Sequence, residues 1–446
     1  MLPESIAQLA QVISGELSGT GIVTGFAIDS RKVEPGDLFI ALQGARDGHD
    51  FLVAAAEAGA AAALVSRSQS VLPAIRVADP EVAMTDLARH FRDQFTNPVI
   101  ALTGSQGKTS TRGFIDAVLT HMANARQQQI LVTRGNFNNQ LGVPLTAARL
   151  RPEHAFAVFE LGASAVGDIA HIAAIVRPHV SALLNARAAH LEGFGSMQGV
   201  IQGKGEIIDH TDVRGTVVLN CDEPAFQTWR ARAGQRAVRT FGRHTGDVQW
   251  HPKTDQSFDL RIDGDTFEVR LPTLGQHFME NAAAAAAVCF AVGATHEDIH
   301  AGLQSARIEP GRMTPIDLPG LRLIDDSYNA SPEAVCAAID WLATQPGQRM
   351  LVMGHLAELG AESGAEMHRL GRYAKAQGLD ALIAIGDAQP IAEGYGDGAH
   401  YFASIANLAP QLIGLVASMD TVLVKGSRSA QMDRVVAMLQ TDFGRP

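Results

Sequence analysis

The sequence predicts an α/β fold of three domains, and three observations lead to that prediction. An apolar run over 99–103 has the pattern of a buried strand, breaks at a glycine-containing turn, and restarts as a helix from Lys108. Strand and helix patterns alternate regularly over 314–446, which is typical of a doubly wound sheet. At 446 residues, the chain is too long for one ordinary hydrophobic core. We therefore expect domains at 1–96, 97–313 and 314–446.

Composition and charge indicate a well-buried globular protein. Hydrophobic residues make up 46% and charged residues 19% of the chain. A net charge of −11 without any basic block argues against nucleic acid or an anionic membrane surface as a partner. No signal-peptide pattern opens the chain, and its longest apolar stretch, 282–294, is too short to cross a bilayer. Three cysteines without metal-like spacing indicate reduced thiols: Cys221, Cys289 and Cys336. We expect a cytoplasmic monomer with no membrane insertion.

The N-terminal block reads as a small α/β unit. Strand patterns occur at 26–28, 37–42 and 61–65, and a helix pattern at 51–58. Two polar segments follow directly after strands, where α/β folds bind ligands. Their candidate ligand residues are Ser30, Arg31, Asp47, Gly48 and His49. Composition alone fits ordinary surface turns equally well.

The central block opens with the parts of a phosphate-binding loop. Glycines at 104 and 107 let backbone N–H groups close around phosphate oxygens, and the following helix adds partial positive charge. Lys108 supplies a full charge, and the Thr109 hydroxyl suits Mg²⁺. The pattern is G-x-x-G-K-T, shorter than the eight-residue P-loop, because Leu102 stands where its first glycine would be. Strand before and helix after favour nucleotide binding over a plain glycine-rich turn.

Further polar groups follow the other strands predicted for this block. The amide-rich segment 133–140 suits a polar, amide-bearing ligand or an ordinary turn, and its candidates are Asn136, Asn138 and Asn139. Glu160 ends a strand at 155–160, and a strand at 180–185 leads to His190. A carboxylate or histidine at a strand end beside a phosphate loop is well placed to hold Mg²⁺.

The last part of the central block departs from the parallel pattern. Two alternating runs, 258–262 and 267–271, flank Asp263-Gly264 and predict a β-hairpin, and an alanine-rich helix is expected over 281–291. In the C-terminal block, the expected strands are 321–326, 350–353, 381–385 and 421–424. The expected helices are 332–343, 364–377 and 431–439. Polar segments again follow the strands.

Segments in all three blocks resemble the Mur ligases, the ATP-dependent amide-forming enzymes of peptidoglycan synthesis. These segments are DSRKVEPGDLFIALQG, ALTGSQGKTS, TRGNFNNQLGVPLT, FELGAS, AAHLEGFGS, KGEII, IDDSYNAS, ELG and VKGSRS. The longer ones are far more specific than the phosphate loop. They resemble the dipeptide-adding type rather than the sister enzymes that add single amino acids.

The resemblance implies three domains: one for a uridine nucleotide, a central ATPase domain, and a Rossmann-like domain for the incoming dipeptide. It implies ATP-dependent ligation of D-alanyl-D-alanine to UDP-N-acetylmuramoyl-tripeptide through an acyl phosphate. That reaction is the last cytoplasmic step toward the peptidoglycan precursor. The implied cofactors are ATP and Mg²⁺ at two sites.

The resemblance also implies site residues, position by position. Those at the nucleotide and its metal ions are Gly104, Ser105, Gly107, Lys108, Thr109, Ser110, Glu160, His190, Lys204, Asn281, Arg312, Asp326 and Asn329. Thr109 and Glu160 would bind one Mg²⁺. His190 would bind a second, together with Lys204, which matches a lysine that family members carry as a carbamate. Arg312 would contact the γ-phosphate, and the N-terminal ligand residues match the uridine loops.

Departures and rival functions qualify this assignment. Phe278 replaces the first Asn of H-N-x-x-N, His355-Leu356 replaces Asp-Met, and Ser331 replaces an Asn, which implies altered nucleotide and dipeptide contacts. The alternatives are a single-amino-acid Mur ligase, a P-loop kinase or GTPase, and a non-catalytic ATP-binding protein of the same fold. The candidate catalytic residues, which a non-catalytic copy would tend to lose, are Lys108, Glu160, His190, Lys204 and Arg312.

Overall fold

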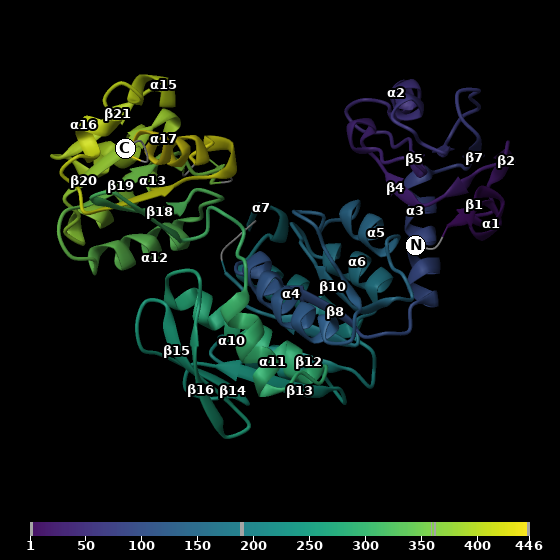
Figure 1. The fold of residues 1–446 in the computed structure, drawn as a ribbon, viewed down its shortest axis with the longest axis horizontal. Coiled ribbons are helices and arrows are strands. Elements are labelled where there is room, and N and C mark those ends of the chain that lie inside the picture. The colour runs from purple at the N-terminus through teal and green to yellow at the C-terminus, as the bar shows by residue number, and fades with distance from the viewer. Residues whose placement is uncertain (1–2, 188–190, 358, 361–362, 444–446) are drawn as a thin grey trace. The chain divides into compact units, whose positions relative to one another are not determined.

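The computed structural model describes residues 3–187, 191–357, 359–360 and 363–443. The chain divides into two compact units. The first unit comprises residues 1–251, 259–269 and 280–306, and the second comprises 252–258, 270–279 and 307–446. Both are α/β, as expected, and each strand-rich segment is visible by its label in Figure 1.

The N-terminal sheet has five strands in the order β2-β7-β6-β5-β4. Its strands are β2 Glu16–Ser18, β4 Gly25–Ala27, β5 Asp37–Ile40, β6 Ala62–Val65 and β7 Ala74–Arg76. The four from β4 to β7 run parallel, and β2 is antiparallel to β7. A separate pair joins β1 Glu4–Ser5 to β3 Ile22–Val23. The three expected strands are confirmed as β4, β5 and β6, whereas the short β2 and β7 were not predicted.

Helix α3 (Pro80–Gln94) joins this sheet to the rest of the first unit. Asp79 caps it by accepting hydrogen bonds from the N–H groups of Glu81 and Val82, and Pro80 occupies its first position. Helices α1 (Ile6–Val12) and α2 (Leu52–Glu57) complete the domain. Side chains of α3 share a hydrophobic core with Leu145 and Ala148 of the next segment.

One buried arginine of α3 ties the helix to the central part of the same unit. Arg92 is 7% exposed. Its guanidinium donates to the carbonyls of Val176 (2.6 Å), Phe95 (2.8 Å) and Arg177 (2.8 Å). A buried guanidinium is tolerated because its N–H groups are hydrogen-bonded in this way.

The central sheet has nine strands in the order β16-β15-β14-β13-β12-β11-β8-β10-β9. Its strands are β8 Val99–Thr103, β9 Gln129–Val132, β10 His154–Glu160, β11 Val180–Leu183, β12 Thr216–Asn220, β13 Ala237–Gly242, β14 Val248–Pro252, β15 Ser257–Ile262 and β16 Asp265–Arg270. Those from β9 to β14 are parallel. The expected hairpin is confirmed: Asp263 and Gly264 both have positive φ, as a two-residue β-turn of this kind requires.

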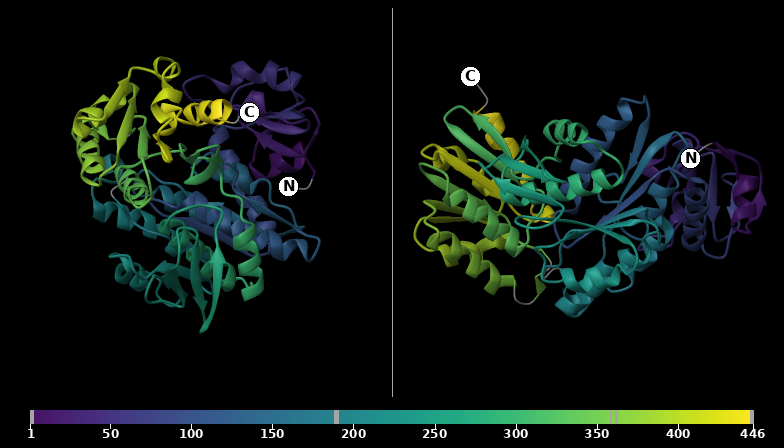
Figure 2. Two further views of the ribbon diagram at one scale, coloured as in Figure 1. Left: turned by 60° about the vertical axis from the view of Figure 1, so that its left-hand side comes forward. Right: turned by 90° about the horizontal axis from the view of Figure 1, so that it is seen from below.

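Helices cover both faces of this sheet. They are α4 Lys108–Asn124, α5 Gly142–Ala147, α6 Asp168–Val176, α7 Leu191–Phe194, α8 Met197–Asp209, α9 Phe226–Arg232, α10 Gln276–Ala291 and α11 His296–Ser305. Figure 2 (right) shows α4 on the same side as the green helices α10 and α11, with the teal helices on the other side. One continuous core joins the sheet to α6, α8 and α9. The helix expected at 281–291 begins five residues earlier, because its polar first turn hid its start.

The second unit contains a six-stranded sheet in the order β17-β18-β22-β19-β20-β21. Its strands are β17 Thr314–Leu318, β18 Leu321–Asp326, β19 Arg349–Met353, β20 Ala381–Ile385, β21 Ala399–Phe402 and β22 Thr421–Lys425. Only β17 is antiparallel to its neighbour. The helices are α12 Pro332–Ala343, α13 Ser363–Ala376, α14 Gln389–Tyr395, α15 Ile405–Leu408, α16 Leu412–Val416 and α17 Asp433–Phe443. The doubly wound prediction is confirmed, although the last helix lies a few residues later than expected.

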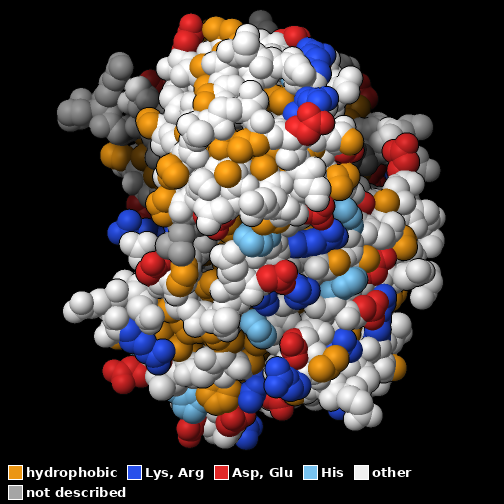
Figure 3. Space-filling view, turned by 90° about the vertical axis from the view of Figure 1, so that its right-hand side faces the viewer, with side chains coloured by type: hydrophobic (Ala, Val, Ile, Leu, Met, Phe, Trp, Pro, Cys, Tyr) orange, Lys and Arg blue, Asp and Glu red, His pale blue; other side chains and the backbone are white. Residues whose placement is uncertain are grey.

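The surface carries charges of both signs. On the face shown in Figure 3, Lys and Arg side chains lie among Asp and Glu side chains, with hydrophobic patches between them. Among the residues that the structure describes, no helix is long and apolar enough to cross a membrane.

Candidate active site

The phosphate-binding loop lies between β8 and α4. Gly107 forms the N-cap of α4 with φ +78°, a left-handed conformation that favours glycine. A side chain there would also collide with Asn281, because an added Cβ would lie 2.3 Å from the Asn281 Oδ1. The Lys108 ammonium donates to the carbonyls of Gly104 (2.7 Å) and Ser105 (3.3 Å). The structure therefore brings the predicted Asn281 against the predicted loop.

The end of the neighbouring strand β11 braces this loop. The Ser105 N–H donates to the Asn185 carbonyl (3.2 Å), and the Gln106 N–H donates to the Asn185 Oδ1 (2.9 Å). The Asn185 amide returns a hydrogen bond to the Gln106 carbonyl (3.2 Å). Ser110, on the first turn of α4, is buried. Sequence reasoning assigned Asn185 no role, although its place at the end of a strand beside the loop was a usable signal.

Glu160 lies beside the same loop because β10 pairs in parallel with β8, with Glu160 opposite Leu102. Its side chain is only 2% exposed. The Oε1 atom accepts hydrogen bonds from the Thr109 hydroxyl (3.3 Å) and the Asn138 amide (2.8 Å). The Oε2 atom accepts no hydrogen bond within the described structure, although the Arg112 Nη1 lies 3.3 Å away.

This carboxylate and the Thr109 hydroxyl fit a Mg²⁺ ion. Hard oxygen donors are the ligands that Mg²⁺ prefers, and a buried oxygen without a donor has capacity for a cation. Within the described ranges, no group of three or more His, Cys, Asp or Glu side chains is arranged to hold a metal. Mg²⁺ is commonly held by one or two carboxylates together with phosphate and water, and Glu160 supplies one such carboxylate. His190, the other predicted ligand, lies outside the described residues.

Lys204 lies inside the first unit rather than on its surface. It belongs to α8 and is 2% exposed. Its Nζ donates to the Ala163 carbonyl (3.3 Å) and lies 5.3 Å from the centre of the Phe194 ring. Burial, with a further contribution from the positive charge of Lys108, lowers the pKa of Lys204 to about 7. Lys204 is therefore neither solvated nor at the start of its helix.

The amide-rich segment 133–140 lies between the N-terminal sheet and Glu160. Asn138 contacts Glu160, as described above, whereas the Asn139 Oδ1 accepts from the N–H groups of Leu141 (3.2 Å) and Gly142 (2.9 Å) at the start of α5. Asn136 is exposed. The Lys32 ammonium lies 5.6 Å from the centre of the Phe137 ring, which brings the Ser30–Lys32 turn close to this segment.

The N-terminal candidates form two compact turns. Arg31 donates to both carboxylate oxygens of Asp29 (2.9 and 2.8 Å), and this pairing lowers the pKa of Asp29 to about 2. The His49 Nδ1 pairs with the Asp47 Oδ1 (2.7 Å). Gly48 cannot carry a side chain without displacing the backbone of residues 41 and 42. Ser30 is half-buried in the first turn.

The second unit brings its own candidates together at the carboxyl end of β18. The Lys425 ammonium donates to the Asp326 Oδ2 (2.6 Å) and to the Asn329 carbonyl (3.1 Å), and the Met313 N–H donates to the Asp326 Oδ1 (3.2 Å). Burial raises the pKa of Asp326. The guanidinium of Arg312 stacks 4.1 Å from the centre of the Tyr328 ring.

The residues that depart from the family pattern are either hydrogen-bonded or buried. Ser331 caps α12 by accepting from the Ala334 N–H (3.3 Å). The His355 Nε2 lies 2.8 Å from the Ser429 hydroxyl, which links the loops after β19 and β22. Leu356 and Phe278 are buried, 4% and 3% exposed.

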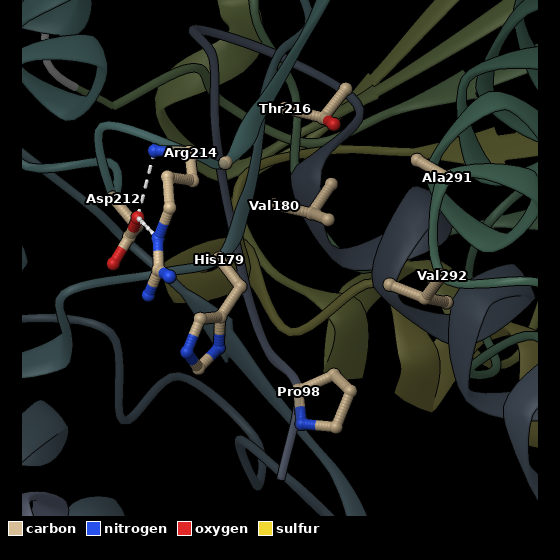
Figure 4. Close-up of a pocket in the computed structure, with 9 residues that line it drawn as sticks. Pro98, His179, Val180, Asp212, Arg214, Thr216, Ala291 and Val292 are labelled. Carbon is tan, nitrogen blue, oxygen red and sulfur yellow. Dashed lines mark hydrogen bonds and ion pairs between the residues drawn. The ribbon is translucent and has the colours of Figure 1, made fainter. Parts of the chain in front are cut away.

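A cavity of about 420 Å³ lies at the amino ends of the interior strands β8, β11 and β12, whereas the phosphate loop follows the carboxyl end of β8. His179 and Arg214 line one side, and Val180 and Val292 lie on the other (Figure 4). Its polar groups are engaged with neighbours: the His179 Nδ1 accepts from the Val99 N–H (2.9 Å). The charged groups at the phosphate loop, and not this cavity, mark the candidate active site.

Comparisons with known proteins match all three blocks of the chain to one family. Family models described as "Mur ligase family, catalytic domain", "Mur ligase middle domain" and "Mur ligase, glutamate ligase domain" match residues 22–92, 102–289 and 311–428. The UDP-N-acetylmuramoyl-tripeptide–D-alanyl-D-alanine ligases of Escherichia coli and Haemophilus influenzae are 41% and 35% identical to the chain, each over 99% of both chains.

Solved structures show the same similarity. A crystal structure of MurF from Acinetobacter baumannii superposes with a TM-score of 0.90 at 35% identity, covering 98% of this chain and 99% of that one. MurF ligase from Thermotoga maritima in complex with ADP superposes with a TM-score of 0.82 at 30% identity, covering 95% and 98%. The three-domain architecture expected from the sequence is confirmed by these neighbours.

Proposed function

The chain belongs to the Mur ligase family, and from that premise we propose that it joins D-alanyl-D-alanine to UDP-N-acetylmuramoyl-tripeptide at the expense of ATP. The observation that carries this function is the match along 99% of both chains to a ligase with that activity at 41% identity. The buried Glu160 and the half-buried Lys108 lie beside one phosphate loop, and they would supply the metal ligand and the positive charge that such a ligase needs.

The proposed reaction has two steps. A free carboxylate resists amide formation because its oxygen is a poor leaving group. Transfer of the γ-phosphate to the carboxylate gives an acyl phosphate, whose leaving group is phosphate. The neutral amine of the dipeptide then attacks the acyl carbon, and the tetrahedral intermediate collapses to amide and phosphate. Holding acyl phosphate and amine together in a dry site accounts for much of the rate.

We propose that two residues of this chain neutralise negative charge in the first step. The two reacting anions repel each other, so charge must be neutralised as the phosphoryl group moves. Lys108 would leave the carbonyls of its own loop and bind the nucleotide phosphates, with Gly104, Ser105, Gly107, Ser110 and Asn281 shaping their site. Arg312 would contact the γ-phosphate, with Asp326 and Asn329 close to the reacting groups.

Mg²⁺ supplies further charge neutralisation when it is bound. Thr109 and Glu160 would hold one ion, and His190 with Lys204 a second. We propose that Lys204 reacts with CO₂ to form a carbamate. As an ammonium it would repel a cation, whereas a carbamate offers oxygen ligands. Its burial and lowered pKa favour the neutral amine that carbamate formation needs.

The remaining assignments concern substrates and setting. Ser30, Arg31, Asp47, Gly48 and His49 would hold the uridine nucleotide. Asn136, Asn138 and Asn139 of segment 133–140 would face the peptide part, and the Asn139 Oδ1 also accepts from two backbone N–H groups at the start of α5. Free thiols at all three cysteines accord with a cytoplasmic location, and we expect a monomer.

The test is a reconstituted reaction. The protein is incubated with ATP, Mg²⁺, D-alanyl-D-alanine and UDP-N-acetylmuramoyl-tripeptide carrying either meso-diaminopimelate or lysine, and ADP and product mass are measured. ADP should form only when both substrates are present. Lys108→Ala should lower the rate at least about 100-fold. Arg126→Ala, an exposed change just beyond the same helix, is the control and should leave the rate unchanged.

Rival functions predict other outcomes in the same assay. A sister ligase would form product with a single amino acid in place of the dipeptide. A kinase or GTPase would turn over nucleotide without the dipeptide, and a non-catalytic protein would bind ATP without turnover. Any of these results would replace the proposed reaction.

A further inference from the structure

Arg112 is a buried charged residue that the proposed reaction does not use. It lies on α4 about one turn beyond Lys108 and is 5% exposed. Its Nη1 donates to the Gly135 carbonyl (2.7 Å) and lies 3.3 Å from the Glu160 Oε2. A buried guanidinium is costly unless it meets acceptors or an opposite charge, so its contacts here are informative.

Arg112 and Thr109 together hold the two oxygens of one carboxylate. They are three residues apart on α4, a spacing that places both side chains on one helix face. The Thr109 hydroxyl contacts the Glu160 Oε1, and the Arg112 guanidinium lies beside the Oε2, which accepts no hydrogen bond in the described structure. Helix α4 therefore contributes a contact to each oxygen of the Glu160 carboxylate.

The segment 133–138 is linked to Glu160 by three contacts, one to its backbone and two to its carboxylate. The Glu160 N–H donates to the Thr133 Oγ1 (3.1 Å). The Asn138 amide donates to the Glu160 Oε1 (2.8 Å). Arg112 supplies the third route, because the nitrogen that lies near the Glu160 Oε2 also donates to the Gly135 carbonyl. A shift of this segment would therefore be felt at the Glu160 side chain.

We propose that Arg112 is a positioning residue that orients Glu160 for Mg²⁺ and couples that carboxylate to the segment 133–138. The proposal rests on the proposed function, which assigns Glu160 to the metal. Partners that orient a metal ligand typically change metal affinity 10- to 100-fold when they are removed, although they touch no metal themselves. Substrate bound against segment 133–138 would then alter Mg²⁺ binding through Arg112.

The test compares Arg112→Met with Arg112→Lys and with a matched control. Arg92→Met removes another buried arginine that donates to backbone carbonyls but lies on α3, away from Glu160. ADP binding is measured by calorimetry with and without Mg²⁺, so no turnover is needed. In Arg112→Met, the gain in ADP affinity caused by Mg²⁺ should fall about 10-fold, while ADP binding without Mg²⁺ changes less than about twofold.

The companion variants separate positioning from folding. Arg112→Lys keeps the positive charge but lacks the planar guanidinium. Its gain in ADP affinity from Mg²⁺ should therefore lie between those of the wild type and Arg112→Met. Arg92→Met should lower the melting temperature and leave the gain in ADP affinity caused by Mg²⁺ at the wild-type level. If Arg112→Met does not fold, the Arg112→Lys result decides: an unchanged Mg²⁺ gain overturns the proposal.

A second arm tests the coupling. UDP-N-acetylmuramoyl-tripeptide should change the Mg²⁺ concentration needed for half-maximal ADP binding in the wild type, and this change should be lost in Arg112→Met. An unchanged Mg²⁺ gain in folded Arg112→Met would mean that the residue is only structural. A larger gain in ADP affinity from Mg²⁺ in Arg112→Met would mean that the guanidinium competes with the metal. Either result overturns the proposal, whereas a wild type that binds no ADP in Mg²⁺ overturns the proposed function instead.

Discussion

Two clusters of buried charge, each at the carboxyl ends of parallel strands, differ in how completely their charges are paired. In the first unit, the Glu160 Oε2 forms an ion pair with the Arg112 Nη1 (3.3 Å) but accepts no hydrogen bond, and the hydrogen bond of the Lys204 ammonium goes to a backbone carbonyl. In the second unit, Lys425 pairs with Asp326 at 2.6 Å, and the other Asp326 oxygen accepts from a backbone N–H. We call the first cluster open, because a buried carboxylate oxygen in it accepts no hydrogen bond. We call the second closed, because its carboxylate is paired and both of its oxygens accept hydrogen bonds.

The difference separates capacity for a ligand from internal support. Nearly all buried polar groups in proteins are paired, so an open cluster signals a missing partner such as a cation or a phosphate. A closed cluster has its partners already, and its loss is felt as loss of stability. We therefore expect changes in the open cluster to affect catalysis and changes in the closed cluster to affect folding.

The largest effect is expected from breaking the closed cluster. Lys425→Met would leave the Asp326 carboxylate buried without its cation and should reduce the free energy of local unfolding by about 3 kcal/mol. Hydrogen exchange of the β18 and β22 amides measures this directly. Adding Asp326→Asn removes the orphaned charge and should recover part of the loss. If Lys425→Met lowers the free energy of local unfolding by less than about 1 kcal/mol, the ion pair does not stabilise this part of the fold as expected.

The open cluster should respond in activity rather than in stability. Lys204→Ala should reduce the rate about 100-fold, through loss of the proposed carbamate ligand, and millimolar acetate should restore part of it. Binding of the uridine nucleotide should persist.

The matched control is Lys375→Ala. Lys375 also donates to one backbone carbonyl, that of Asp397 (2.7 Å), but belongs to α13 of the second unit. Its removal should leave the rate unchanged. Wild-type activity in Lys204→Ala would refute the carbamate, and an acetate effect on the control variant would show that the rescue is non-specific.

The smallest expected effect concerns Ser331, beside the closed cluster. Ser331→Ala removes the N-cap of α12 and should destabilise that helix by about 1 kcal/mol, as other cap removals do. Ser331→Asn restores the residue expected from the family pattern and should change the stability by less than about 0.5 kcal/mol, because Asn caps equally well. Thermal unfolding of the two variants compares them. A large loss for Ser331→Asn would mean that Ser331 does more than cap.

Most of the fold was predictable because strand patterns are local. The largely apolar runs that became β8, β10 and β20 are bounded by turns, so their own pattern located them. The short strands β1, β2, β3 and β7 and the edge strands β9, β17 and β21 escaped prediction, because their pairing partners rather than their own pattern make them strands. The interior strands β12, β13 and β14 of the central sheet were also not predicted.

The candidate site was predictable only where a motif carried it. The phosphate loop and Glu160 follow local patterns, and the structure brings them together. Asn185 and Arg112 were missed because their roles depend on partners far along the chain; Asn185 braces a loop 79 residues earlier. The burial of Lys204 was missed for the same reason, since the covering residues come from other segments.

The tie made by Arg92 has a consequence for substrate choice. It fastens the N-terminal sheet to the end of α6, within the same unit as the phosphate loop. If the uridine nucleotide is held by the N-terminal turns as proposed, the span from uridine to phosphate loop is fixed by this fastening. The first unit would then select substrates by length. A nucleotide whose peptide arm is one residue too short would still be held by its uridine, but its carboxylate would not reach the phosphate.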